Sequence, residues 1–282
     1  MLAWDKETRF GALIGGVSAF VLLVDNKHGV KRDGFLEPAW TMLLYVALPV
    51  LAICIYEANK RRKAAITIGS FGLLLVLIPI VHRAWIDGGR SHYYHHKEQM
   101  VYAALLGLGL GFATARAGSV RLQEWGFGLG DWRWWVPRCG LLLLGVLPLV
   151  AFGASMSPEL LQFYPEVPFA RESVSGLVRY QLGNGVYMMA WEWFFRGFLL
   201  FGIARYWGAV PAILIQAYPF MLMHKAKPEL EMAASFGGSV LLGIFCLRAR
   251  CFWPAFILHW FMNIDMEATG YLNHHELLWF GK

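Results

Sequence analysis

The stretch "MAWEWFFRGFLL", residues 189–200, is apolar and aromatic except for one acid, Glu192, and one base, Arg196. Residues four apart on a helix lie on the same face one turn from each other, so the two side chains are predicted to pair. Charge is costly in surroundings that resemble lipid, and residues of this kind normally face the interior of a helix bundle. The stretch therefore predicts a buried helix that carries either a structural ion pair or part of a site.

The composition extends this interpretation to the whole chain. Of its 282 residues, 57% are hydrophobic and 16% are charged, whereas a typical soluble domain has about 25% charged residues. Several apolar runs approach the roughly 20 residues that a helix needs to cross a bilayer. We therefore predict an all-α fold, a polytopic membrane helical bundle with about 8–9 transmembrane helices. The predicted spans are roughly 10–25, 39–56, 64–82, 99–115, 134–153, 180–203, 207–223, 232–248 and 251–266.

The connections between these spans are too short for a soluble domain. The longest, Ser155–Arg179, is expected to be a loop because Pro165 and Pro168 interrupt any helix. Ionisable residues lie deep in apolar runs only in the later spans. We therefore predict three parts: an N-terminal four-helix transmembrane scaffold (1–118), a core that carries the chemistry (119–270), and a C-terminal tail (271–282).

Basic residues predict the orientation. The stretch "NKRRK" (59–63) is the strongest cytoplasmic marker, and counting spans from it places the amino terminus on the cytoplasmic side. Lys31 and Arg32 then fall on the opposite side, against the rule. Since the basic residues lie mainly between apolar runs, the net charge of +6 does not suggest a nucleic-acid partner. The four cysteines lie within or beside apolar runs and are expected to be buried free thiols.

Three further polar residues accompany the charged pair. His224 ends the seventh predicted span, and His259 and Asn263 lie four apart on one face of the last span. A carboxylate can take a proton from water, imidazoles can hold that water or an oxyanion, and an amide can donate a hydrogen bond. Together with Glu192 and Arg196, these residues predict a site that activates water inside the bundle.

The motifs "WEWFFRG" (191–197), "FMLMH" (220–224) and "HWFMN" (259–263) resemble those of the CPBP family of intramembrane proteases, which includes the type II CAAX prenyl endopeptidases and the bacterial Abi proteins. The family motifs are Glu-Glu-x-x-x-Arg, Phe-x-x-x-His and His-x-x-x-Asn or -Asp. The resemblance covers about 120–266. It implies glutamate-dependent peptide hydrolysis, with the water held by the Glu and His224, the oxyanion by His259 and Asn263, and the acid positioned by Arg196.

One position departs from the family pattern. Aligning the motif on Arg196 places Glu192 at the second acid and Trp191 at the first, which in the family is taken to activate the water. Three interpretations stay open. Glu192 does this work itself, a substitute acid does it, with Glu229 and Glu231 as candidates, or the site is inactive.

The resemblance also implies the partners. We expect membrane lipid and a protein or peptide substrate with a membrane-embedded or lipid-bearing end, and no nucleic acid. No cofactor is expected. Zinc is compatible with Glu and His side chains but is not favoured, since His224 and His259 do not share one helix turn as in a His-Glu-x-x-His site. The alternatives are a catalytically inactive immunity or scaffold protein that kept the fold and, with less support, a proton-coupled transporter.

Overall fold

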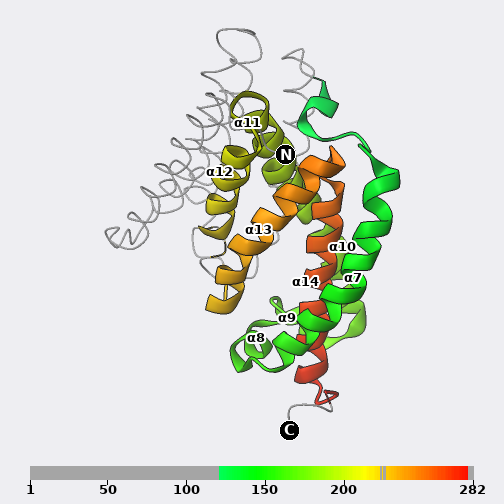
Figure 1. Ribbon diagram of the computed structural model, residues 1–282. Coiled ribbons are helices and arrows are strands. Elements are labelled where there is room, and N and C mark those ends of the chain that lie inside the picture. The colour runs from blue at the N-terminus through cyan, green and yellow to red at the C-terminus, as the bar shows by residue number, and fades with distance from the viewer. Residues whose placement is uncertain (1–120, 223, 225–226, 279–282) are drawn as a thin grey trace, which may run out of the picture.

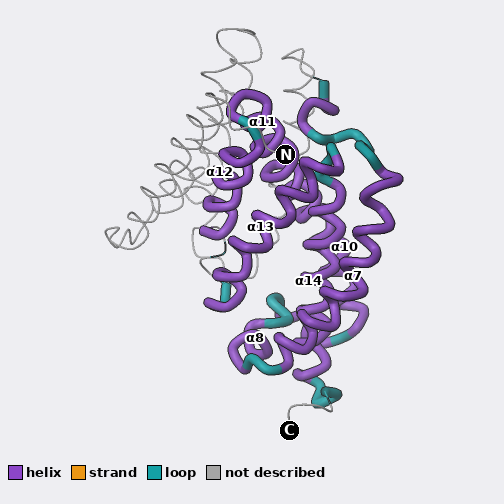
Figure 2. The backbone as a smooth tube through the Cα atoms, in the orientation of Figure 1, coloured by secondary structure: helices purple, strands orange, loops and turns teal. Residues whose placement is uncertain are grey.

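The computed structural model describes residues 121–222, 224 and 227–278, and every regular element in this part is a helix (Figures 1 and 2). The four spans predicted within 1–118 and the basic stretch at 59–63 lie outside the described residues. The helices are η3 (Leu122–Trp125), α7 (Trp132–Ser155), α8 (Pro158–Phe163), α9 (Pro168–Glu172), α10 (Val174–Glu192), η4 (Trp193–Leu199), α11 (Leu200–Trp207), α12 (Ala209–Leu222), α13 (Glu229–Ala249) and α14 (Trp253–His274). The prediction of an all-helical fold is confirmed for the described residues.

Two of these helices, α7 and α13, are long and apolar enough to cross a membrane. α7 leaves large apolar side chains exposed along its length, among them Leu141, Leu144, Leu149 and Phe152. Such a continuous exposed apolar surface is unusual in a soluble protein and fits contact with lipid. The number of spans in the whole chain stays a prediction.

The connection between Ser155 and Arg179 differs from the predicted loop, because it contains α8, α9 and the start of α10. Pro158 and Pro168 each occupy the first position of a helix. Proline is favoured there, since its missing N–H would have no helical partner and its φ angle suits the helix. Ser157 and Ser173 cap α8 and α10 by accepting hydrogen bonds from backbone N–H groups. The prolines therefore break the chain into short helices instead of keeping it irregular.

The long helices form two neighbouring groups. α14 packs against both α7 and α10, while α12 packs against α13 and α11 (Figure 1). The two groups meet through η4 and the crossing of α13 with α14. Gly130, in the segment before α7, packs against the end of α13. Its φ angle is 55°, and a Cβ there would lie 2.1 Å from the carbonyl oxygen of Ala249, so only glycine fits.

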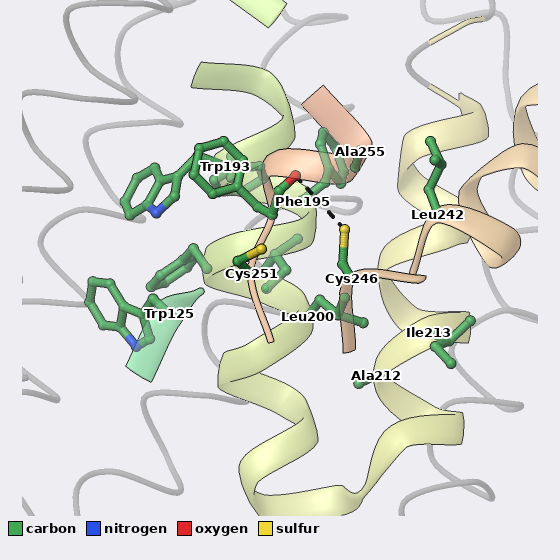
Figure 3. Packing of buried hydrophobic residues seen from close by; sticks show 14 of the residues in the cluster. Trp125, Trp193, Phe195, Leu200, Ala212, Ile213, Leu242, Cys246, Cys251 and Ala255 are labelled. Carbon is green, nitrogen blue, oxygen red and sulfur yellow. Dashed lines mark hydrogen bonds between the residues drawn. The ribbon is translucent and has the colours of Figure 1, made fainter. Parts of the chain in front are cut away.

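An aromatic core surrounds the junction of η4, α13 and α14 (Figure 3). Trp193, Phe195, Phe198 and Phe252 are almost completely buried in it. Cys246 donates a hydrogen bond from Sγ to the carbonyl oxygen of Phe252 at 3.8 Å, drawn as the dashed line in Figure 3. The three described cysteines are free and buried, which confirms the prediction for them. This packing fixes η4, and with it the charged pair that the sequence predicted.

Candidate active site

Glu192 is the last residue of α10, and Arg196 lies in η4, which is a π-helix. π-helical turns are rare and are found frequently at functional sites. Nη1 of Arg196 donates to Oε1 of Glu192 at 2.9 Å and lies 2.8 Å from Oε2. Both side chains are completely buried, and the guanidinium lies 3.8 Å from the centroid of the Phe220 ring. The two charges therefore compensate each other inside the bundle.

Glu192 has a second partner, which lies 67 positions later in the sequence. Nδ1 of His259, on α14, donates to Oε1 of Glu192 at 2.5 Å. Oε1 therefore accepts from both Arg196 and His259, while Oε2 lies beside Arg196 and has no hydrogen-bond partner among the described residues. Since one carboxylate oxygen holds Nδ1, the tautomer and ring orientation of His259 are fixed, and Nε2 is the atom left for chemistry.

His224 follows the end of α12, and its ring is also held at Nδ1. That atom lies 2.8 Å from the carbonyl oxygen of Phe220, which can only accept, so Nδ1 carries the proton. In neutral His224 the lone pair is therefore on Nε2. The rings of His224 and His259 have centroids 6.2 Å apart, with their planes inclined by 31°. The structure thus brings together two imidazoles that are 35 positions apart in the numbering.

Trp191 lies beside His224. The ring centroids of Trp191 and His224 are 6.5 Å apart, and Trp191 also contacts Phe220 and Phe195. The residue at the position of the family's first acid is therefore near the imidazole, as the resemblance implies, but it is an indole without a carboxylate. Glu192, the next residue, faces Arg196 and His259 instead.

Asn263 lies one turn beyond His259 on α14, and its carboxamide is held from α10. Nδ2 of Asn184 donates to Oδ1 of Asn263 at 2.6 Å, and Nε2 of Gln181 donates to the same oxygen at 3.2 Å. All three side chains are buried. Since the oxygen accepts from both donors, the NH₂ group of Asn263 is the end that stays available.

The two candidate substitute acids differ in their surroundings. Glu229 is exposed, whereas Glu231 is half-buried and both of its oxygens accept from the hydroxyl of Tyr164, at 3.0 and 2.8 Å. Burial, with the nearby charges of Glu231 and Glu166, raises the pKa of Tyr164 well above its ordinary value, so the hydroxyl keeps its proton and donates. Nζ of Lys227 lies 2.9 Å from Oε2 of Glu166 and 3.3 Å from the Tyr164 hydroxyl. Glu231 therefore belongs to a polar cluster and Glu229 does not.

This cluster is close to the two imidazoles. Glu231 interacts electrostatically with His259, and Lys227 does so with His224.

Within residues 121–222, 224 and 227–278, no three His, Cys, Asp or Glu side chains are grouped so that they could hold a metal ion. The residues present therefore do not fit a zinc site in this part of the chain.

Sequence reasoning missed Gln181, Asn184 and Tyr164. Gln181 and Asn184 precede Glu192 by eleven and eight positions, three helical turns and just over two. They therefore lie on the same buried face of α10 as Glu192, and this spacing was the available signal. Tyr164 lies between two short helices and carried no such signal.

Comparison with known proteins supports the interpretation of these motifs. Residues 177–264 match the family described as "Type II CAAX prenyl endopeptidase Rce1-like". This confirms the predicted resemblance for a segment that contains both imidazoles, the charged pair and Asn263. No curated protein and no solved structure matched the chain. The two long apolar helices and the family match together indicate an integral membrane protein that is similar to this family over residues 177–264.

Proposed function

We propose that the chain is an intramembrane endopeptidase that hydrolyses a peptide bond in a protein tail with a membrane-embedded or lipid-bearing end. One observation carries the proposal. His224 and His259 lie next to each other, and each has its Nδ1 bound within the protein. In the described part of the chain, this leaves two Nε2 atoms on one site, beside the amide of Asn263.

In this mechanism His224 is the general base. Its Nε2 takes a proton from water as the water oxygen attacks the carbonyl carbon of the scissile bond. The carbonyl oxygen becomes an oxyanion, which collapses as the C–N bond breaks, and the proton passes from His224 to the leaving amine. The products are a new carboxylate and a new amine, and a positioned base of this kind typically contributes about 10²–10⁴-fold to the rate.

The oxyanion is held from α14. His259, when protonated, donates from Nε2, and Asn263 donates from Nδ2. The two residues are four apart, so both groups lie on one face of the helix. Each such donor typically contributes about 10²–10³-fold to the rate of acyl transfer. Glu192 stabilises the His259 imidazolium and fixes its ring.

We assign the role of the missing first acid to Glu231. Glu192 is completely buried, with Oε1 bound to Arg196 and His259 and Oε2 beside Arg196, so neither oxygen is exposed to water. Glu231 shares the polar cluster with Glu166, interacts electrostatically with His259, and is held by the Tyr164 hydroxyl. A carboxylate at this place can orient the water toward His224.

We propose a substrate class and a topology on the basis of the family match and the sequence. The match is to prenyl endopeptidases, so a protein tail that carries a prenyl group is the substrate class to test first. We infer that the chain crosses the membrane several times with its amino terminus on the cytoplasmic side. We further propose that residues 1–118 form a four-helix scaffold and that the core begins at 119; α14 continues past the predicted boundary at 270 to His274, so the tail begins after it.

The test uses the full chain in liposomes and a fluorescence-quenched peptide ending in a farnesylated CAAX sequence. Wild type is expected to cleave the peptide, and His224→Ala and His259→Ala are expected to lower kcat by at least about 100-fold. The assignment of the acid is tested by Glu231→Gln, with Glu229→Gln as the matched control on the same turn. We expect loss of activity for the first and none for the second. A folded wild type that leaves the peptide intact would favour a non-catalytic membrane partner.

A further inference from the structure

We propose that Asn184 and Gln181 are positioning residues, which hold the carboxamide of Asn263 so that its NH₂ group is turned toward the oxyanion. This inference rests on the proposed function of the site, because it gives Asn263 a donor role. Neither residue belongs to the three motifs that identified the site.

The polarity of the contacts carries the inference. A carboxamide can turn by half a rotation, which exchanges its oxygen and its nitrogen. Here Asn184 and Gln181 both present NH₂ groups to Asn263, at 2.6 and 3.2 Å from Oδ1. The turned carboxamide would place three NH₂ groups together without an acceptor among them. Two donors on one oxygen therefore favour the orientation in which the NH₂ group of Asn263 faces away from α10, while Oε1 of Gln181 stays buried without a hydrogen-bond partner among the described residues.

Burial makes this preference strong. The exposed fractions of Asn184, Gln181 and Asn263 are 1%, 7% and 7%. Water has little access to compensate a lost hydrogen bond, and a buried polar group without a partner is costly. The orientation of Asn263 is therefore set by the protein before any substrate arrives.

The close approach of α10 and α14 makes these contacts possible. A Cβ at Gly185 would lie 2.6 Å from Cζ2 of Trp260, so the indole lies directly on the backbone of α10. Nε1 of Trp260 also donates to the carbonyl oxygen of Gln181 at 3.2 Å. These two contacts fix the register in which Asn263 lies between Gln181 and Asn184.

α10 thus orients both groups that α14 contributes. Glu192 holds His259, and Asn184 with Gln181 holds Asn263. Glu192 and Asn184 are eight positions apart on α10, and their partners His259 and Asn263 are four apart on α14. The order of the partners is reversed along the two helices. One helix therefore carries the donors to the substrate, and its neighbour determines how they point.

The decisive variant is Asn184→Asp, measured with the farnesylated peptide in liposomes. The ionised carboxylate that it introduces accepts instead of donating, so it attracts the NH₂ group of Asn263 and turns Oδ1 toward the substrate. We expect kcat to fall about 10²–10³-fold, the usual loss for one oxyanion donor, with KM unchanged. Asn184→Ala keeps the donor Gln181, so we expect its kcat to fall by no more than about tenfold. Asn273→Asp, an exposed position near the end of α14, is the matched control and keeps the kcat of wild type.

A pH series separates orientation from a purely structural role. The introduced carboxyl group donates again once it is protonated, so the ratio of the kcat of Asn184→Asp to that of wild type should rise as the pH is lowered. Equal losses for Asn184→Ala and Asn184→Asp, or a ratio independent of pH, would overturn the inference. Should Asn184→Asp fail to fold, Gln181→Glu makes the same inversion at the second donor. An inactive wild type would count against the proposed function, whereas an active Asn184→Asp beside an inactive His224→Ala would count against this inference alone.

Discussion

Replacing Glu192 by Gln should lower the free energy of unfolding while it leaves the packing almost unchanged. The two side chains are nearly equal in size, so the change removes the negative charge and little else. Arg196 remains completely buried. Its Nε and Nη2 atoms have no hydrogen-bond partner among the described residues, so Glu192 is the group that compensates its charge. Glu192→Gln therefore leaves a buried cation without a counter-ion within the described part of the chain.

The size of the effect follows from this geometry. Removing one partner of a buried ion pair typically costs about 3–5 kcal/mol, whereas replacing both partners by apolar residues is often close to neutral. Glu192→Gln is therefore expected to lower the free energy of unfolding by about 3–5 kcal/mol. Glu192→Met combined with Arg196→Met should recover most of that loss and still be inactive, because His259 then lacks the carboxylate that orients it.

The assay is reversible unfolding in mixed detergent micelles, followed by tryptophan fluorescence and by circular dichroism. Wild type, the single variant and the double variant are compared under one condition. A single variant as stable as wild type would refute the reasoning, because the charge of Arg196 would then be compensated elsewhere. A double variant as unstable as the single one would refute it as well.

Two further predictions concern packing and the polar cluster. Gly185→Ala should lower the free energy of unfolding in micelles by about 1–3 kcal/mol, because its Cβ meets the Trp260 ring at 2.6 Å. Gly183→Ala is the control, because its Cβ meets nothing within 4 Å, and it should not lower this free energy. Tyr164→Phe should leave Glu231 without its hydroxyl donor and lower kcat in the liposome assay while the KM for the peptide stays the same. An unstable Gly183→Ala or a fully active Tyr164→Phe would contradict the respective prediction.

The sequence predicted the helices that periodicity and composition determine. Apolar runs between short polar connections predicted the helices now seen as α7, α10 to α14, and the spacing of four predicted the contact of Glu192 with Arg196. Spacing succeeded because residues four apart lie close to one helical turn from each other, and this holds although Arg196 lies in a π-helical turn.

Features that depend on long-range packing were not predictable in this way. The π-helix at Trp193–Leu199 has no signature in composition, because it is stabilised by the aromatic core around it. The contact of Asn184 with Asn263 joins residues 79 positions apart and depends on the register of α10 and α14. That register is set by the fit of Trp260 onto Gly185, which no single stretch of sequence reveals.

The position of the acid is the instructive case. The sequence alone did not decide which of Glu192, Glu229 and Glu231 acts on the water. Adjacent helical positions point about 100° apart, and a loop can fold back. The structure buries Glu192 completely between Arg196 and His259, leaves Glu229 exposed, and holds Glu231 in the polar cluster. Only three-dimensional contacts could separate the three carboxylates.

The most direct test of the central claim is a single turnover of the liposome-embedded chain on the farnesylated peptide in H₂¹⁸O, with the products weighed by mass spectrometry. Attack by water at the site of His224 and His259 predicts one ¹⁸O atom in the new carboxylate from wild type and no product from His224→Ala. Products from His224→Ala at the wild-type rate, or an intact peptide after incubation with folded wild type, would contradict it.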